Sequence, residues 1–212
     1  MNEHNSTLNY YNQFAQDFIN NTFNADVSES LNNFMQLLPP NASVLDVGCG
    51  SGRDTLTLIN NGFNVTAFDA SPALAKLAQK TIQHPVIIKN IEDMSWNNEF
   101  DAVWAMASLL HLKKEELPNA IEHCIQALKK DSQGFFFASF KMGNGEGYDD
   151  KGRYFSYYQE QELKDILLSK DIFTNLSFTI NEDTLGRPGL SWISFIAEKP
   201  SLKLNNKKRF KF

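Results

Sequence analysis

Three glycines and an acid alternate with other residues between Asp46 and Gly52, in the stretch SVLDVGCGSGRDT. Glycine tolerates a positive φ and lets the backbone approach a ligand closely, so the pattern Asp46-x-Gly48-x-Gly50-x-Gly52 predicts a ligand-binding loop. The stretch lacks the Gly-Lys-Ser/Thr ending of a phosphate-binding P-loop. A dinucleotide fingerprint starting at Gly48 would require glycine or alanine at position 53, where the chain has Arg53.

A carboxylate inside the loop discriminates among the remaining ligands. Asp46 would repel a pyrophosphate, but it suits a ligand that carries an ammonium or sulfonium group. Asp69 ends the next strand-like run, NVTAFDA, 23 residues after Asp46. In nucleoside-binding folds, an acid after the second strand accepts hydrogen bonds from both ribose hydroxyls. Together the two acids predict a cationic nucleoside as the ligand.

Each of these charged residues also has a purely structural interpretation. Asp46 could satisfy backbone donors at the turn, and Asp69 could cap a helix that begins near Pro72. Arg53 could pair with a local acid instead of contacting a ligand. The joint presence of two acids around three glycines at this spacing favours the ligand-binding interpretation.

The elements that must position these residues alternate between strand and helix patterns. Strand patterns occur at residues 43–47, 64–70, 85–90, 100–107 and 134–140. Helix patterns follow at residues 53–62, 72–83 and 114–130. Several strands are apolar on both faces, which is typical of a parallel sheet covered by helices on both sides. Such α/β sheets bind ligands outside the carboxyl ends of their strands.

The two ends of the chain add further elements. Helical spacing predicts one helix over residues 8–23 and another over 28–38, before Pro39 and Pro40. The glycine-rich residues 140–155 predict a mobile loop, followed by a helix at 158–170. Two β-type runs at 173–183 and 189–199 predict a terminal hairpin. We therefore expect an N-terminal helical lid over residues 1–38, a main domain over 39–200 and a basic C-terminal tail over 201–212.

Composition limits the classes of function. The chain has 212 residues, of which 42% are hydrophobic and 21% charged, as in one globular domain. We expect a soluble cytoplasmic protein, because the N-terminus lacks a leader pattern and Cys49 and Cys124 are isolated. The net charge of −5 argues against nucleic-acid binding. His4, His84 and His123 have no metal-ligand grouping, and no metal is expected.

Three stretches together carry a family resemblance. VLDVGCGSGRD, VTAFDAS and FDAVWAMASLLHL resemble motif I, the second-strand acid and the fourth-strand region of class I S-adenosylmethionine-dependent methyltransferases. The stretches ASFKMGNGEG and GRYFSYY also resemble small bacterial methyltransferases of the tellurite-resistance type. The resemblance implies a Rossmann-like α/β fold with seven strands in the order 3-2-1-4-5-7-6, the last one antiparallel. It also implies methyl transfer from S-adenosylmethionine, with S-adenosylhomocysteine as product.

The resemblance assigns roles to the glycine loop and its acids. Gly48, Gly50 and Gly52 would lie under the methionine part of the cofactor. Asp46 would lie near the cofactor amino group, directly or through water. Asp69 would hold the ribose hydroxyls.

The same resemblance assigns the other cofactor contacts. Ala70 and Ser71 would lie beside the adenosine, and Asn90 and Ile91 would flank the adenine ring. Ala105, at the end of the fourth strand, would offer its carbonyl to the cofactor ammonium. The predicted cofactor site also includes Tyr11, a lid residue in the N-terminal helix, and Arg53, a basic residue of the loop.

Methyl transfer from a sulfonium needs no universal catalytic residue, because holding donor and nucleophile in line supplies most of the acceleration. Where the acceptor is a hydroxyl or a protonated amine, a base helps, and His111 is the candidate. His111 could instead only cap a helix or fix its loop. The candidate acceptor-binding residues are Ser108, Arg153, Tyr154 and Tyr157.

We expect a small-molecule acceptor. The alternatives are an RNA or protein methyltransferase and a non-catalytic protein that binds S-adenosylmethionine. Acidic net charge counts against an RNA substrate. The sequence predicts neither the acceptor atom nor the oligomeric state.

Overall fold

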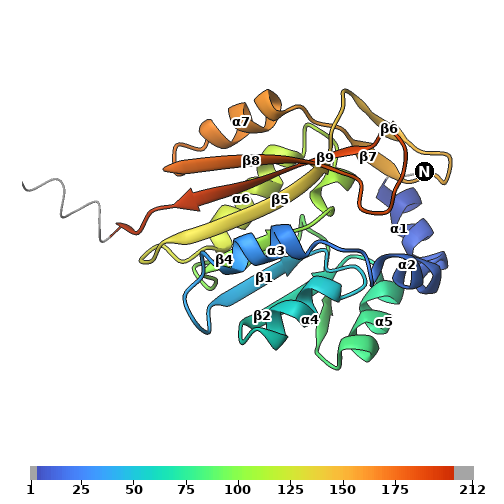
Figure 1. The fold of residues 1–212 in the computed structure, drawn as a ribbon, viewed down its shortest axis with the longest axis horizontal. Helices are drawn as coiled ribbons and strands as arrows, with labels where there is room; N and C mark the ends of the chain where they lie inside the picture. Colours follow the sequence, from blue (N-terminus) through green and yellow to red (C-terminus); the bar gives the residue numbers. More distant parts are fainter. Residues whose placement is uncertain (1–3, 203–212) are drawn as a thin grey trace, which may run out of the picture.

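The computed structural model describes residues 4–202 of the chain. Its main sheet has the strand order β3-β2-β1-β4-β5-β9-β8 (Figure 1). The strands of this sheet are β1 Ser43–Val47, β2 Asn64–Asp69, β3 Val86–Ile88, β4 Ala102–Ala105, β5 Gly134–Lys141, β8 Asn175–Glu182 and β9 Ser191–Lys199. The first five are parallel, and β9 runs antiparallel to both of its neighbours, β5 and β8. Because β8 and β9 are the sixth and seventh strands of this sheet, the predicted order 3-2-1-4-5-7-6 is confirmed.

Helices cover both faces of the sheet. One face carries α3 Ser28–Met35, α4 Arg53–Asn60 and α5 Pro72–Ile82, and the other carries α6 Leu117–Ala127 and α7 Glu160–Leu168 (Figure 1). All eight residues of β5 are buried, as expected for a strand that is apolar on both faces. The Trp104 and Phe137 rings stack in the core with centroids 3.9 Å apart.

The N-terminal helices lie at the end of the sheet where the parallel strands finish (Figure 1). The single helix predicted over residues 8–23 is two helices, α1 His4–Gln13 and α2 Ala15–Thr22, because Phe14 leaves the helical region at φ −111° and ψ 25°. The break turns α2 so that Ala15 and Ile19 pack on Leu74 of α5. The lid prediction therefore applies to two short helices docked on α5.

The prediction of a loop without secondary structure at residues 140–155 is wrong. The chain forms an antiparallel hairpin there, β6 Glu146–Tyr148 with β7 Tyr154–Ser156. Asp149 closes the turn by accepting hydrogen bonds from the backbone N–H and the guanidinium of Arg153. The Tyr148 and Tyr154 rings pack edge to face across the strands, with centroids 5.2 Å apart. These contacts favour a hairpin in this segment despite its glycine content.

The expected division into a lid over residues 1–38, a main domain over 39–200 and a tail over 201–212 stays a prediction. Helix α3 falls within the predicted lid segment, yet its Leu31 and Phe34 are buried against the sheet. We therefore confine the lid proposal to α1 and α2. The basic end of the predicted tail, NNKKRFKF, lies outside the described residues. Within residues 4–202, no helix is both long and apolar enough to cross a membrane.

Candidate active site

Two cavities open at the carboxyl ends of the parallel strands, on either side of the glycine loop. The β2-side cavity, of about 760 Å³, is lined by residues such as Asp69, Ser71 and Asn90. The β5-side cavity, of about 440 Å³, is lined by residues such as Ser139, Lys141 and Trp192. The cavities share lining residues from the lid, the glycine loop and the segment after β4, which are Tyr11, Phe18, Gly48, Gly50, Ala107 and His111. Both volumes are in the range of small-molecule sites.

The glycine loop is shaped by close neighbours as well as by its backbone angles. Gly48 has φ +70°, and a Cβ there would lie 2.6 Å from the Cβ of Ser108. Gly50 has φ +55°, and a Cβ there would lie 3.2 Å from the Phe18 ring of α2. A side chain at either position would therefore be strained and would also push away a wall of the cavities. Gly52 starts α4 and lines neither cavity.

Asp69 holds the glycine loop to the start of α5. One carboxylate oxygen accepts from the Gly50 N–H at 2.9 Å, and the other accepts from the Ser71 N–H at 2.8 Å. Burial raises the pKa of Asp69, while these two backbone donors oppose the rise. The residue that caps α5 is Ser71, whose Oγ accepts from the Leu74 N–H, and not Asp69 as the structural interpretation supposed. Each oxygen of Asp69 can accept a further hydrogen bond, and the residue lines the β2-side cavity.

Asp46 is a buried carboxyl group without an ion-pair partner among residues 4–202. It accepts a 2.5 Å hydrogen bond from the Thr55 hydroxyl of α4. Burial, with a further contribution from the nearby Asp54, raises the pKa of Asp46 to about 7. The side chain lines the β5-side cavity. A cation placed against Asp46 would stabilise its charged form.

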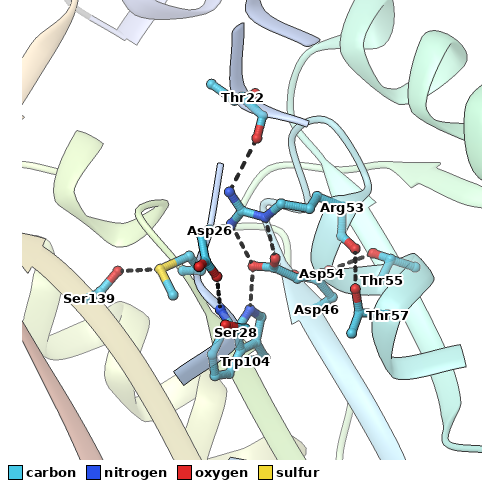
Figure 2. A network of polar contacts seen from close by, with 11 residues as sticks. Thr22, Asp26, Ser28, Asp46, Arg53, Asp54, Thr55, Thr57, Trp104 and Ser139 are labelled. Carbon is cyan, nitrogen blue, oxygen red and sulfur yellow. Dashed lines mark hydrogen bonds and ion pairs between the residues drawn. The ribbon is translucent and has the colours of Figure 1, made fainter. Parts of the chain in front are cut away.

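Arg53 pairs with a local acid. Its Nε donates to Asp54 at 2.6 Å and its Nη1 donates to the Thr22 carbonyl at 3.3 Å (Figure 2). The same Asp54 accepts from the Trp104 indole N–H at 2.9 Å. Arg53 thus ties the end of α2 to α4 at the wall of the β5-side cavity. This arrangement agrees with the structural interpretation, and a ligand contact for Arg53 stays a prediction.

The remaining predicted cofactor residues divide between the cavity wall and the core. Ala70, Ser71, Asn90 and Ile91 all line the β2-side cavity. Ser71 also donates to the Asn12 side chain of α1 at 2.7 Å, which docks the lid on this wall. Ala105 is fully buried, and its side chain lines neither cavity.

The segment after β4 contains strain and an unsatisfied polar group. Ala107 has φ +51°, a rare conformation for a residue with a Cβ, and its N–H donates to Ser139 Oγ. Ser108 Oγ is buried and has no hydrogen-bond partner among the described residues. Because such groups are normally satisfied, a ligand in the β2-side cavity is a reasonable partner for Ser108. Strain of this kind clusters at functional sites.

His111 is hydrogen-bonded through both ring nitrogens. Nδ1 lies 2.7 Å from the Tyr154 carbonyl, which can only accept, so Nδ1 carries the proton of the neutral ring. Nε2 then accepts from the Tyr11 hydroxyl at 2.8 Å. Burial lowers the pKa of His111 to about 4 and raises the pKa of Tyr11, so both groups stay neutral near pH 7. The contacts support a positioning role for His111, and its role as a base stays a prediction.

The predicted acceptor-binding residues are not all at one place. Arg153 lines the β5-side cavity, whereas Ser108 and Tyr154 line the β2-side cavity. Tyr157 lines neither and packs against Gly143.

Sequence reasoning missed Lys141 and Phe18. The alternation Phe137-x-Ser139-x-Lys141 puts Lys141 on the cavity-lining face of β5, a period-2 signal that could have identified it. Phe18 lies at helical spacing from Tyr11, and this spacing could have identified it as a second lid residue.

The sequence matches known methyltransferases. Residues 44–131 match a family described as Methyltransferase domain. An "Uncharacterized methyltransferase" of Staphylococcus carnosus is 27% identical over 207 residues, covering 92% of this chain and 94% of the relative. A "Ubiquinone biosynthesis O-methyltransferase" of Xanthomonas axonopodis is 32% identical over 111 residues, covering 49% of this chain and 45% of the relative. This second match therefore spans less than half of either protein.

Solved structures share the fold. A 1,6-didemethyltoxoflavin-N1-methyltransferase of Burkholderia thailandensis superposes with a TM-score of 0.67 at 23% identity, covering 82% of this chain and 78% of that one. At this identity the likeness speaks for the fold alone. The matched methyltransferase domain contains the glycine loop and both acids, and the sheet has the strand order expected of the superfamily. The chain is therefore a class I S-adenosylmethionine-dependent methyltransferase.

Proposed function

We propose that the chain transfers a methyl group from S-adenosylmethionine, held in the β2-side cavity, to a small molecule held in the β5-side cavity. The observation that carries this proposal is that the two cavities meet at the glycine loop. A donor and an acceptor placed on its two sides would face each other across Gly48 and Gly50. In-line displacement needs this arrangement more than it needs a particular reactive side chain.

The residues of the β2-side cavity fit the nucleoside part of the cofactor. Asp69 has lone pairs available for ribose hydroxyls beyond its two backbone contacts. Asn90 and Ile91 would flank the adenine, and the unsatisfied Ser108 hydroxyl would gain a partner. Asp46 would face the cationic end of the cofactor. These assignments, with Tyr11, Ala70 and Ser71 as further contacts, remain proposals.

The cofactor supplies a methyl group on a sulfonium, which is a good leaving group. The protein would contribute alignment, and well-oriented reactants gain roughly 7–11 kcal/mol from it. Helices α1 and α2 would exclude water, because Tyr11 and Phe18 line both cavities from the lid side. His111, held between Tyr11 and Tyr154, would keep the lid and the β6–β7 hairpin together over the reactants.

The small-molecule acceptor is supported by the size of the β5-side cavity, about 440 Å³. The names of the Xanthomonas and Burkholderia proteins also refer to the methylation of small molecules. An RNA or protein substrate and binding without turnover remain the alternatives. We also propose a cytoplasmic location, since Cys49 and Cys124 are free thiols.

Calorimetry tests the cofactor site. S-adenosylmethionine should bind, while NAD and ATP should bind far more weakly. Asp69→Ala should cost about 1.5–3 kcal/mol of cofactor affinity, because ribose hydroxyls lose a charged acceptor. Asp101→Ala is the control, because Asp101 accepts hydrogen bonds from Ser43 and Lys129 at the start of β4. This change should reduce stability only. Equal cofactor affinity of the wild type and Asp69→Ala would disprove the assignment.

Turnover distinguishes the enzyme from the alternatives. Release of S-adenosylhomocysteine should be measured across a panel of metabolites, with a mixture of RNA and protein substrates as a second arm. Tight cofactor binding without turnover on either arm would favour a non-catalytic binding protein. Turnover on the RNA and protein arm alone would favour that class of acceptor.

A further inference from the structure

The β5-side cavity contains a buried lysine without a charged partner. Lys141 is only 8% exposed at the end of β5. Its ammonium nitrogen lies 3.2 Å from the centroid of the Phe155 ring and has no hydrogen bond or ion pair among residues 4–202. Buried ammonium groups are normally paired. An unpaired one that lines a cavity is therefore suited to an anionic ligand.

The neighbouring charges do not neutralise Lys141. Arg153 is paired with Asp149 at 2.6 Å on the β6–β7 hairpin. Arg187 is paired with Asp183 in the turn between β8 and β9. Each of these two pairs is neutral as a unit, so neither pair offsets the charge of the buried Lys141. Burial, followed by the two guanidinium groups, lowers the pKa of Lys141 to about 8, which leaves it mostly protonated at pH 7.

The cavity is therefore polarised along its length. The glycine-loop end holds the buried Asp46, and the hairpin end holds the buried Lys141. The acidic residues at the exposed rim are Asp26, Glu29 and Glu182. Apolar walls lie between the two ends and come mainly from Leu110, Phe137, Phe155 and Trp192. A cationic methyl donor suits the first end and an anionic group suits the second.

We propose that Lys141 binds an anionic oxygen, such as a carboxylate or phenolate, of a small aromatic methyl acceptor. This inference rests on the proposed function, because it names the acceptor class for the same site. Phe155, Trp192 and Phe137 contact the ring, and the ammonium of Lys141 selects acidic compounds over their neutral counterparts. The carboxylate of the cofactor is the competing candidate for this ammonium, because the cationic end of the cofactor would face Asp46 at the other end of the same cavity.

The test compares charged and neutral probes of one shape. Benzoate and benzamide are titrated into the protein without cofactor, and binding is followed by NMR or calorimetry. The wild type should prefer benzoate, and Lys141→Met should weaken benzoate binding by about 10-fold to 100-fold while benzamide binding changes little. Lys141→Arg should retain most of the preference. The control is Lys151→Met, which removes an exposed charge from the β6–β7 turn and should leave both probes unaffected.

The pH dependence gives a second readout. Benzoate affinity should fall as the pH rises through about 8, because Lys141 loses its proton there. The other charged or titratable groups that face Lys141 are Arg153, Asp149, Arg187, Asp183 and His111. The two ion pairs stay charged and His111 stays neutral between pH 7 and 9. Asp46 ionises near pH 7 at the other end of the cavity in both proteins, so Lys141→Arg should remove only the part of the fall near pH 8.

Three results would overturn the proposal. The first is that the wild type shows no preference for benzoate over benzamide. The second is that Lys141→Met keeps the preference. The third is that Lys141→Met weakens S-adenosylhomocysteine binding and leaves benzoate binding unchanged, which would assign the ammonium to the cofactor. Because the probes are measured without cofactor, failure of the methyltransferase proposal would be seen separately, as absent cofactor binding and turnover.

Discussion

The Tyr11 hydroxyl donates a 2.8 Å hydrogen bond to His111 Nε2, joining α1 to the segment after β4 across 100 residues of sequence. Further hydrogen bonds anchor α1. The Thr7 hydroxyl oxygen accepts from the Tyr154 N–H at 2.8 Å, and the Asn12 side chain accepts from Ser71 Oγ at 2.7 Å. Helix α1 thus bridges the β6–β7 hairpin and the start of α5 over both cavities.

Tyr11→Phe should loosen this bridge. The lost hydrogen bond is worth about 0.5–1.5 kcal/mol, so amide exchange in α1 should become about 2-fold to 10-fold faster. Tyr10→Phe is the matched control, because the Tyr10 hydroxyl makes no hydrogen bond within the described residues, although its ring stacks with Arg153. Adding cofactor should slow exchange in α1 and α2 of the wild type. Exchange that does not respond to cofactor would mean that these helices are only packing elements.

His111→Asn distinguishes a positioning residue from a base. A positioning role predicts lower cofactor affinity and faster lid exchange, with turnover at saturating cofactor reduced less than about 10-fold. A base predicts a loss of about 10²-fold to 10⁴-fold in turnover with cofactor affinity almost intact. The measurement is a full kinetic comparison once an acceptor is known.

The pH dependence of stability provides an independent check on His111. Its pKa is lowered to about 4 in the fold, against about 6.5 in an unfolded chain. The stabilising contribution of the neutral ring is present above pH 6.5 and is lost as the pH falls toward 4. Wild-type stability should therefore drop more steeply than that of His111→Asn in this interval. Parallel curves in urea denaturation would contradict a buried neutral imidazole.

Cofactor affinity should depend on pH through Asp46. Its pKa is raised to about 7 by burial, and a bound cation requires the carboxylate form. Binding should therefore release a proton and strengthen from pH 6 to 8, as measured by calorimetry. Asp46→Asn should remove this component, while titration of the cofactor amine contributes equally to both proteins. The same pH dependence in both proteins would exclude Asp46 from the cation site.

Gly48→Ala should lower the stability of the fold more than Gly62→Ala, although both glycines have a positive φ. Gly62 has φ +85° and open space around a Cβ, so Gly62→Ala reports backbone strain alone, about 1–2 kcal/mol. Gly48→Ala adds a clash with Ser108, typically another 1–3 kcal/mol. It should also displace Ser108 and weaken cofactor binding, whereas Gly62→Ala should not. Equal losses of stability in denaturant titrations would show that the loop yields to the new side chain.

Local patterns predicted most helices and strands, because each of these elements has a sequence signal within a few residues. The apolar run of β5 and the proline at the start of α5, Pro72, are signals of this kind. The seven-strand order and the methyltransferase class came from a resemblance carried by motif I and Asp69, and both are confirmed. The likeness to the tellurite-resistance type stays a prediction.

The contacts that complete the site depend on tertiary packing. Nothing near Tyr11 in the sequence points to His111 as its partner. The glycines of residues 140–155 indicated a loop, so the hairpin that Asp149 closes was not predicted. The partner of Arg53 was left open by the sequence, which allowed a local acid and a ligand equally; the structure identifies the acid as Asp54. Lys141 was visible only through the alternation of β5, whose meaning depends on which face lines the cavity.

The turns that bound the β5-side cavity are each closed by their own ion pair, Asp149 with Arg153 and Asp183 with Arg187. Neither pair involves the glycine loop. Each turn can therefore keep its shape when residues elsewhere on it change, and the loop that faces the methyl donor is untouched by such changes. Under the proposed function, acceptor choice would then be a modular property of segments 142–158 and 182–192. Grafting these segments between related chains is then a route to new acceptors on an unchanged donor site.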